Sequence, residues 1–225
     1  MNALLGDEDH AAVSAAVAEA EARTSGEIVT VLAERSDSYH DIALAWAALA
    51  GMSLLVLASI FPAPLIELMS AADAGWGAQP GAGAILAAGA MIAIAGFLIC
   101  WFAQTMDKVR FALVPGGVRT ARVHARALTI FKVGAERRTK GHTGIIIYLS
   151  LRERRAEILA DQAIAGRVSE DVWGEAMAAM LFELKQGRTA PAMIVAVRQV
   201  GLVLAEHFPR ETDDRNELPD RLIEL

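Results

Sequence analysis

The sequence of 225 residues predicts an α/β fold with a short mixed sheet, interrupted by an inserted two-helix transmembrane hairpin. Two long apolar segments without charge predict the hairpin. Short β-branched runs, which alternate with helical patterns on both sides of these segments, predict the α/β part.

The first elements are a helix over residues 7–23 and a strand that begins at Glu27. Asp7 is the expected N-cap, and acidic residues in the first turn suit the positive end of the helix dipole. The sequence TSG at 24–26 ends the helix. The run EIVTVLAE that follows is β-branched and bounded by turn residues, as is typical of a strand.

Residues 42–61 and 82–103 are the two apolar segments, and neither contains a charged residue. Each is about as long as the 20 residues that a membrane span needs. The alternative is a pair of buried helices in a soluble core, but such helices rarely lack charge over more than five turns. Proline and glycine in the connection, 62–81, predict an irregular loop there.

The distribution of basic residues predicts the orientation of the hairpin. The connection between the spans contains no Lys or Arg, whereas residues 104–155 contain twelve basic and three acidic residues. Basic residues collect on the cytoplasmic side of a membrane, so both termini are expected there. The basic residues expected at the membrane surface are Lys108, Arg110, Arg119, Arg122 and Arg126.

The remaining elements follow the second span. An amphipathic helix with a basic face is expected from residue 118 to about 138, then a strand within 140–150 and a second strand at 155–161. The short turn LRERR between these strands requires antiparallel pairing. Ser169 is the expected cap of a helix over 170–186, which Gly187 ends. A last apolar helix starts at 189; its charged residues argue against a third span.

The order of elements indicates one α/β domain split by the hairpin. The domain consists of residues 1–41 and 105–225, and the hairpin of residues 42–104. A strand–helix–strand crossover makes the first two strands parallel. Their carboxyl ends then form one edge of the sheet, which is the usual ligand crevice and is expected to face the bilayer.

Three segments resemble the TPM-domain family, named after thylakoid-lumen, photosystem-repair and receptor-auxiliary proteins. They are EAEARTSGEIVTVL, TKGHTGIIIYLSLRERRAEILADQAI and LAEHFPRETDDRNELPDRLIEL, and the acidic tail resembles a bacterial membrane branch with two internal spans. The resemblance implies an α/β/α sandwich. It also implies one of two functions, an acid phosphatase with a divalent metal or an accessory protein of membrane complexes. Many members keep the domain outside the cytoplasm, whereas the charge bias of this sequence predicts it inside.

Carboxylates are the best candidates for chemistry, since the sequence contains neither a P-loop nor a GxSxG motif. Hard cations such as Ca²⁺ or Mg²⁺ prefer several carboxylate oxygens, and Arg155 could hold a phosphate beside them. The alternative is an ordinary charged strand end and a solvated tail. The candidate metal ligands are Glu157, Asp161, Asp213, Asp214 and Glu217.

A second group of polar residues follows the first two strands, and it is predicted to meet at one rim of the sheet: Glu34, Ser36, Asp37, Ser150 and Arg152. Such a rim suits lipid headgroups or a protein partner, or is simply polar loop surface. The sequence therefore favours a non-enzymatic accessory protein of the bacterial inner membrane. Its expected partners are an integral membrane protein or a second copy bound through the small residues of the hairpin, and not nucleic acid. The alternative is a metal-assisted phosphatase.

Overall fold

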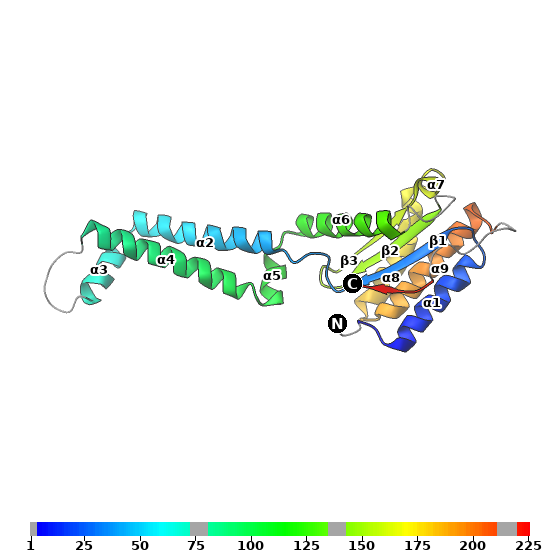
Figure 1. The fold of residues 1–225 in the computed structure, drawn as a ribbon, viewed down its shortest axis with the longest axis horizontal. Coiled ribbons are helices and arrows are strands. Elements are labelled where there is room, and N and C mark those ends of the chain that lie inside the picture. The colour runs from blue at the N-terminus through cyan, green and yellow to red at the C-terminus, as the bar shows by residue number, and fades with distance from the viewer. Residues whose placement is uncertain (1–3, 73–80, 135–142, 211–219) are drawn as a thin grey trace. The chain divides into compact units, whose positions relative to one another are not determined.

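The structure, a computed structural model, describes residues 4–72, 81–134, 143–210 and 220–225. The chain forms two compact units (Figure 1). The first combines residues 1–37 with 116–225, and the second consists of residues 38–115. Helices and a small mixed sheet make this an α/β protein, as predicted.

The first unit contains the sheet. Its elements in chain order are α1 (Asp7–Glu21), β1 (Glu27–Ala33), α6 (Gly116–Gly134), β2 (Gly144–Ser150), β3 (Arg155–Ala160), α7 (Gln162–Ala165), a 3-10 turn (Glu170–Val172), α8 (Trp173–Lys185), α9 (Thr189–His207) and β4 (Ile223–Glu224).

The sheet has the order β3-β2-β1-β4. β1 pairs in parallel with β2, with Glu27 opposite Gly144, and β2 pairs antiparallel with β3. Both pairings confirm the sequence prediction. β4 was not predicted; this two-residue strand brings the end of the chain alongside β1 in parallel.

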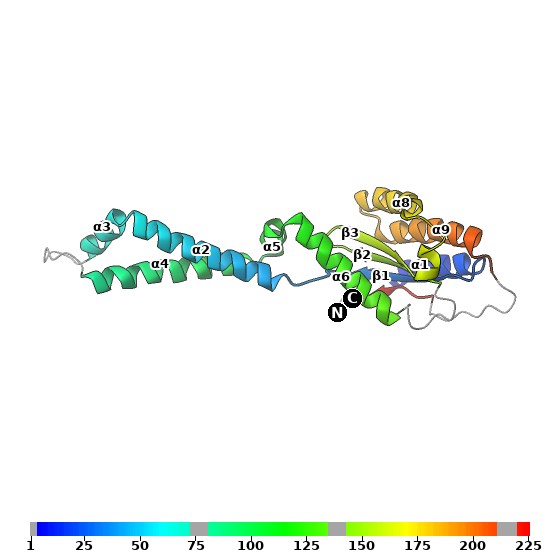
Figure 2. The same ribbon diagram turned by 90° about the horizontal axis from the view of Figure 1, so that it is seen from above.

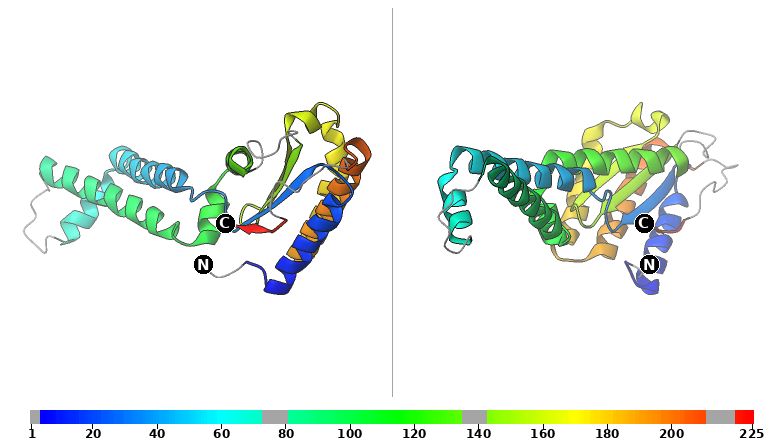
Figure 3. Two further views of the ribbon diagram at one scale, coloured as in Figure 1. Left: turned by 45° about the vertical axis from the view of Figure 1, so that its right-hand side comes forward. Right: turned by 60° about the vertical axis from the view of Figure 1, so that its left-hand side comes forward.

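Side chains of the central strands alternate between two apolar clusters. In β2, Ile145, Ile147 and Leu149 belong to the cluster that includes α1, α8 and α9, whereas Ile146 and Tyr148 belong to the cluster with α6. Successive side chains of a strand point to opposite faces, so β2 is buried on both. Figures 2 and 3 show α6 on one side of the sheet and α1, α8 and α9 on the other.

The helix ends differ in detail from the prediction. Gly6, not Asp7, is the N-cap of α1, and Asp7 is the first residue of the helix. Ser169 does not cap α8, because the 3-10 turn comes first and Val172 takes the cap position without a side-chain hydrogen bond. Gly187 follows α8 with φ of 75°, a left-handed conformation that favours glycine and confirms the predicted end.

The second unit contains only helices among its described residues. They are α2 (His40–Ile60), α3 (Ala63–Ala72), α4 (Ala82–Ala103) and α5 (Asp107–Leu113). The prediction of an irregular connection over 62–81 is wrong for its first half, where α3 lies. Pro64 does not prevent that helix, because it lies in the first turn, where backbone N–H groups have no helical partner.

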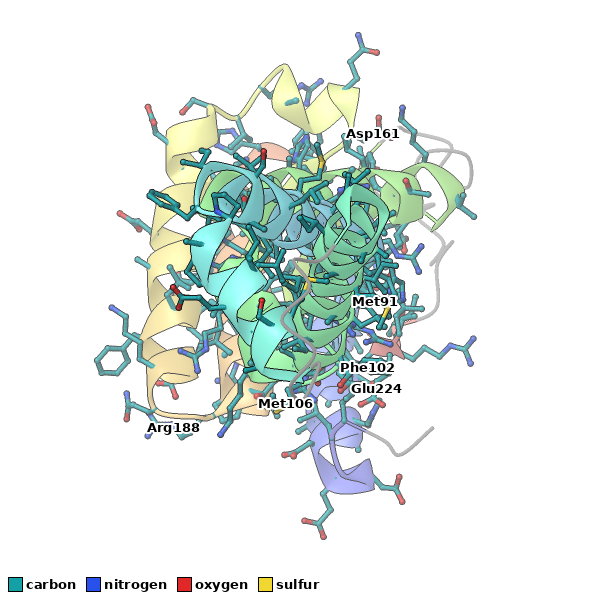
Figure 4. All side chains as sticks on the ribbon, turned by 90° about the vertical axis from the view of Figure 1, so that its left-hand side faces the viewer. Met91, Phe102, Met106, Asp161, Arg188 and Glu224 are labelled. Atoms are coloured by element: carbon teal, nitrogen blue, oxygen red, sulfur yellow. The ribbon has the colours of Figure 1, made fainter. Side chains whose placement is uncertain are left out.

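Helices α2 and α4 pack closely along glycines. A Cβ on Gly51 would lie 2.8 Å from the carbonyl oxygen of Ala93, and one on Gly96 would overlap the side chain of Leu54. The outward faces of these helices are apolar. Met91 and Phe102 on α4, labelled in Figure 4, are 69% and 64% exposed.

Candidate functional site

A polar cluster lies where β1 and β2 end. Ser36, which follows β1, donates its backbone N–H to Glu153 at 2.9 Å, and its hydroxyl lies 2.8 Å from the hydroxyl of Tyr148 on β2. Ser150 at the end of β2 donates its hydroxyl to the same Glu153 carboxylate. Because β1 and β2 are parallel, their carboxyl ends meet at one rim, and the predicted convergence of Ser36 and Ser150 is confirmed.

Charged residues extend this rim cluster. Arg152 donates to Glu34 at 3.0 Å, and Arg122 of α6 lies 3.3 Å from Asp37. These pairs are partly exposed, whereas the Glu153 side chain is buried. The rim therefore has a buried, hydrogen-bonded base and an exposed surface of paired charges.

The Tyr148 hydroxyl at the base of this cluster has a raised pKa. Burial is the main cause; the hydrogen bond with Ser36 lowers the pKa and the negative charge of Glu153 raises it further. Like an ordinary tyrosine, Tyr148 is protonated in the neutral range and can donate a hydrogen bond. Sequence reasoning missed Tyr148 and Glu153, because Tyr148 is part of the apolar strand and Glu153 of the charged turn.

The five basic residues predicted at the membrane surface divide between the two units. Lys108 and Arg110 belong to the second unit, and the other three are on α6 in the first. Lys108, Arg122 and Arg126 are exposed. Arg110 has a local role, since it donates to the carbonyl oxygens of Gln104 and Ser38.

The structure gives local partners to the two predicted metal ligands that it describes. Glu157 on β3 lies 3.3 Å from His124 of α6. Asp161, labelled in Figure 4, follows β3 and caps α7, where its carboxylate accepts the N–H of Gln162 at 2.6 Å. Asp213, Asp214 and Glu217 lie outside the described residues. Within those residues, no three metal-ligating side chains lie together.

A groove of about 600 Å³ runs along the outer side of β3. Leu128 and Phe131 of α6 line one part of it, and Trp173 and Met177 of α8 line another. Side chains of β3, including Ile158, and residues around α7, including Val168, also line it. The sequence marked Trp173 and Met177 only as core positions, because nothing in the local pattern shows that α8 lies beside the edge strand.

An acidic pocket of about 170 Å³ lies near the end of α1, between Glu21, Glu27 and Asp220. Burial raises the pKa of Glu21 to about 9; the backbone N–H of Ile28 opposes this shift, and the negative charges of Glu27 and Asp220 add to it. Glu21 is therefore a neutral acid at pH 7. Its sequence position is that of an ordinary helix end, so no local signal could reveal it.

The fold resembles that of a protein of known structure. The NMR structure of BA42 protein from the psychrophilic bacterium Bizionia argentinensis matches with a TM-score of 0.59 and 19% identity, over 100% of this chain and 98% of that chain. At this identity the likeness concerns the fold alone. No family model matches the sequence, and no curated protein matches it.

Proposed function

We propose that this chain is a membrane-anchored accessory protein of the TPM-domain type, which binds a membrane component and performs no chemistry of its own. In this proposal, the unit of residues 1–37 and 116–225 forms a three-layer α/β/α sandwich. The unit of residues 38–115 contains a transmembrane hairpin, inserted into the chain of the first.

The observation that carries the proposal is the exposed apolar surface of α2 and α4. The two helices have 21 and 22 residues, and only 17% and 11% of their most apolar windows are buried. At 1.5 Å per residue, each is about as long as the 30 Å of hydrocarbon in a bilayer. Water is an unfavourable solvent for such a surface, whereas lipid chains are a favourable one.

Helix α9 is also long and apolar enough to cross a membrane, but its window is 44% buried. Its residues Met193, Val197 and Val200 are completely buried in the cluster beside the sheet. The proposal therefore assigns α9 to the α/β unit and counts two spans.

The basic residues after α4 favour an orientation with both termini in the cytoplasm of a bacterial inner membrane. The rim cluster supports binding rather than catalysis, because its serines, tyrosine and carboxylates bond to one another. A paired, partly exposed surface of this kind suits a polar partner. The phosphatase alternative requires the tail acids beside Asp161 and stays a prediction.

Topology is tested by labelling single cysteines with a membrane-impermeant maleimide. In a Cys100→Ser background, Ser70→Cys on α3 is expected to react in intact cells, and Ser169→Cys before α8 only after permeabilisation. The reverse pattern would contradict the orientation. Equal reaction of both cysteines in intact cells would contradict the membrane hairpin.

The accessory role is tested with a photo-crosslinking residue in native membranes. At Arg152, on the rim, it is expected to yield one discrete product with a membrane protein, whereas at Lys185, at the end of α8, it is not. Hydrolysis of p-nitrophenyl phosphate by the purified chain, if Asp161→Asn abolished it, would favour the phosphatase instead.

A further inference from the structure

Among the described residues, strand β3 has no strand partner along its outer edge. The N–H of Asp161 donates to the carbonyl of Gly144 at 2.8 Å, and this pair continues the β2–β3 register by one step beyond Ile145 opposite Ala160. Bonded and non-bonded pairs alternate in an antiparallel ladder. Ala156, Ile158 and Ala160 therefore direct their N–H and C=O groups away from β2. In the part of the chain that the structure describes, no strand lies on that side.

The groove described above lies along this edge, and its lining is mostly apolar on both sides of the strand, with Glu157 and His124 as its charged or titratable members. Leu128 and Phe131 lie towards the α6 face, and Trp173 and Met177 belong to α8 on the opposite face. A molecule bound in the groove would thus contact apolar side chains from α6 on one face and from α8 on the other. Along its side it would contact the backbone N–H and C=O groups of β3.

This combination specifies an extended polypeptide. The outward N–H and C=O groups recur at every second residue, and this spacing matches that of another strand. Neither a helix nor a lipid chain can form hydrogen bonds with all of them. A strand buried on both faces needs consecutive apolar residues, as β2 has in Ile145, Ile146 and Ile147. The free edge of β3 is about five residues long, so the bound strand is expected to have about the same length.

The charges along the groove indicate which end of the bound segment is acidic. Arg155 lies at the start of β3, where its guanidinium donates to Thr120 at 3.3 Å, and beside it Glu157 is paired with His124 of α6 at 3.3 Å. The far end of the groove is lined by apolar residues such as Ala165 and Val168. An acidic residue beside Arg155 and an apolar run towards Ala160 complement these two ends.

The position of α8 argues against a second copy joined edge to edge. α8 packs on β3, the strand at this edge of the sheet, while α9 packs on β1 and β2. Paired strands lie about 4.8 Å apart, whereas packed helices need 8–10 Å. Two sheets paired antiparallel through β3 would place both α8 helices on the same face above neighbouring strands, closer than packed helices allow, whereas a single added strand brings no second helix.

We propose that the β3 edge binds an extended segment of a partner protein, with an acidic residue followed by a short apolar run, as an added strand. This inference rests on the proposed accessory function and names the chemistry of the partner. It assigns binding to Ala156, Ile158 and Ala160 through their backbone, and to Trp173 and Met177 through their side chains.

The test uses the full chain in detergent micelles and a displayed library of random eight-residue peptides. The expected binders have one acidic residue before an apolar run. Each binder is then synthesised with single N-methyl groups along its backbone. Methyl groups on alternate residues should weaken binding at least tenfold, because only every second N–H faces β3, and those between should have little effect.

A matched pair of variants tests the protein side. Ala160→Pro removes an outward N–H without breaking the β2–β3 ladder and is expected to weaken binding at least tenfold. Ala160→Ser keeps the N–H and should bind as the parent does. If the proline variant does not fold, the alternation of the N-methyl effects decides the question by itself.

The proposal is overturned if the library yields no binder, if the N-methyl effects do not alternate, or if a folded Ala160→Pro variant binds as the parent does. These failures are distinct from failure of the accessory function. A crosslink from Arg152 to a membrane protein would persist without strand addition at β3.

Discussion

The carboxylate of Glu153 accepts the backbone N–H of Ser36 at 2.9 Å, although the two residues are 117 positions apart. It also accepts the hydroxyl of Ser150. One buried side chain in the β2–β3 turn thus ties together the ends of β1 and β2, and forms the base of the rim cluster.

Replacement of Glu153 by Gln is expected to destabilise the protein by about 1–3 kcal/mol. An amide has one acceptor oxygen in place of two, so either Ser36 or Ser150 loses its acceptor in a buried site. Urea unfolding of the full chain in micelles measures the change. Glu34→Gln, which affects an exposed pair with Arg152, should change stability by less than about 0.5 kcal/mol and is the control. Equal effects of the two substitutions would contradict the assigned role.

Glu21→Gln is expected to stabilise the protein increasingly as the pH rises. The pKa of Glu21 is about 9 in the folded state and has the ordinary value of 4.5 in the unfolded chain. As the pH rises, the unfolded chain therefore loses this proton first, and the stability of the parent protein falls between about pH 4.5 and pH 9. A glutamine cannot ionise and still accepts the N–H of Ile28. At pH 8 the expected gain is about 5 kcal/mol, because each pH unit above 4.5 costs the parent about 1.4 kcal/mol, and at pH 4 it should vanish. Melting curves between pH 4 and 9 measure it; a difference independent of pH would contradict a buried neutral Glu21.

Glu224 on β4 holds the start of the chain, and its removal should release that segment. Its carboxylate accepts the N–H groups of Leu4 and Leu5, each at 2.9 Å, and lies 2.8 Å from His10. Burial raises the pKa of Glu224, but the three hydrogen bonds together lower it by more than burial raises it. The net pKa is below 4.5. The stabilisation is therefore present above pH 4.5 and is lost as the pH falls through the folded-state pKa.

Hydrogen exchange measures this contact directly. In Glu224→Ala, the amides of Leu4 and Leu5 should exchange faster at pH 7, while those of β2 keep their protection. Unchanged exchange at Leu4 would show that the segment is held by other contacts.

Gly201→Ala is expected to destabilise the protein by about 1–3 kcal/mol, because α1 and α9 touch at this glycine. The added Cβ would lie 2.6 Å from the Cβ and 3.4 Å from the Cα of Ala20, so the helices would have to separate. Gly117→Ala on α6 is the control: it meets no atom within 4 Å and should stabilise by up to about 1 kcal/mol through helix propensity. Chemical unfolding of both variants measures the change in the free energy of unfolding, which is expected to have opposite signs in the two. A stabilising Gly201→Ala would contradict the close approach of α1 and α9.

Much of the α/β unit was predictable from local pattern. The continuous apolar run in β2 indicated a strand buried on both faces, and the short turn before Arg155 required a hairpin. The convergence at the rim followed from the parallel pairing of β1 and β2. It needed no knowledge of distant contacts beyond that topology.

The features that were missed depend on distant segments. β4 has two residues and is a strand only because β1 lies beside it. The raised pKa of Glu21 arises from burial and from Asp220 at the other end of the chain. The groove at β3 combines residues such as Leu128, Ile158 and Trp173 from three elements, and no local periodicity indicates that they share a surface.

The α/β unit is expected to fold by itself, without the helices α2 to α5. The most direct measurement is the thermal melt, without detergent, of a chain in which residues 38–115 are replaced by a Gly/Ser linker of about ten residues. We expect a soluble protein with one cooperative transition. Aggregation, or a melt without cooperativity, would contradict it, because the helices would then be part of the same folding unit.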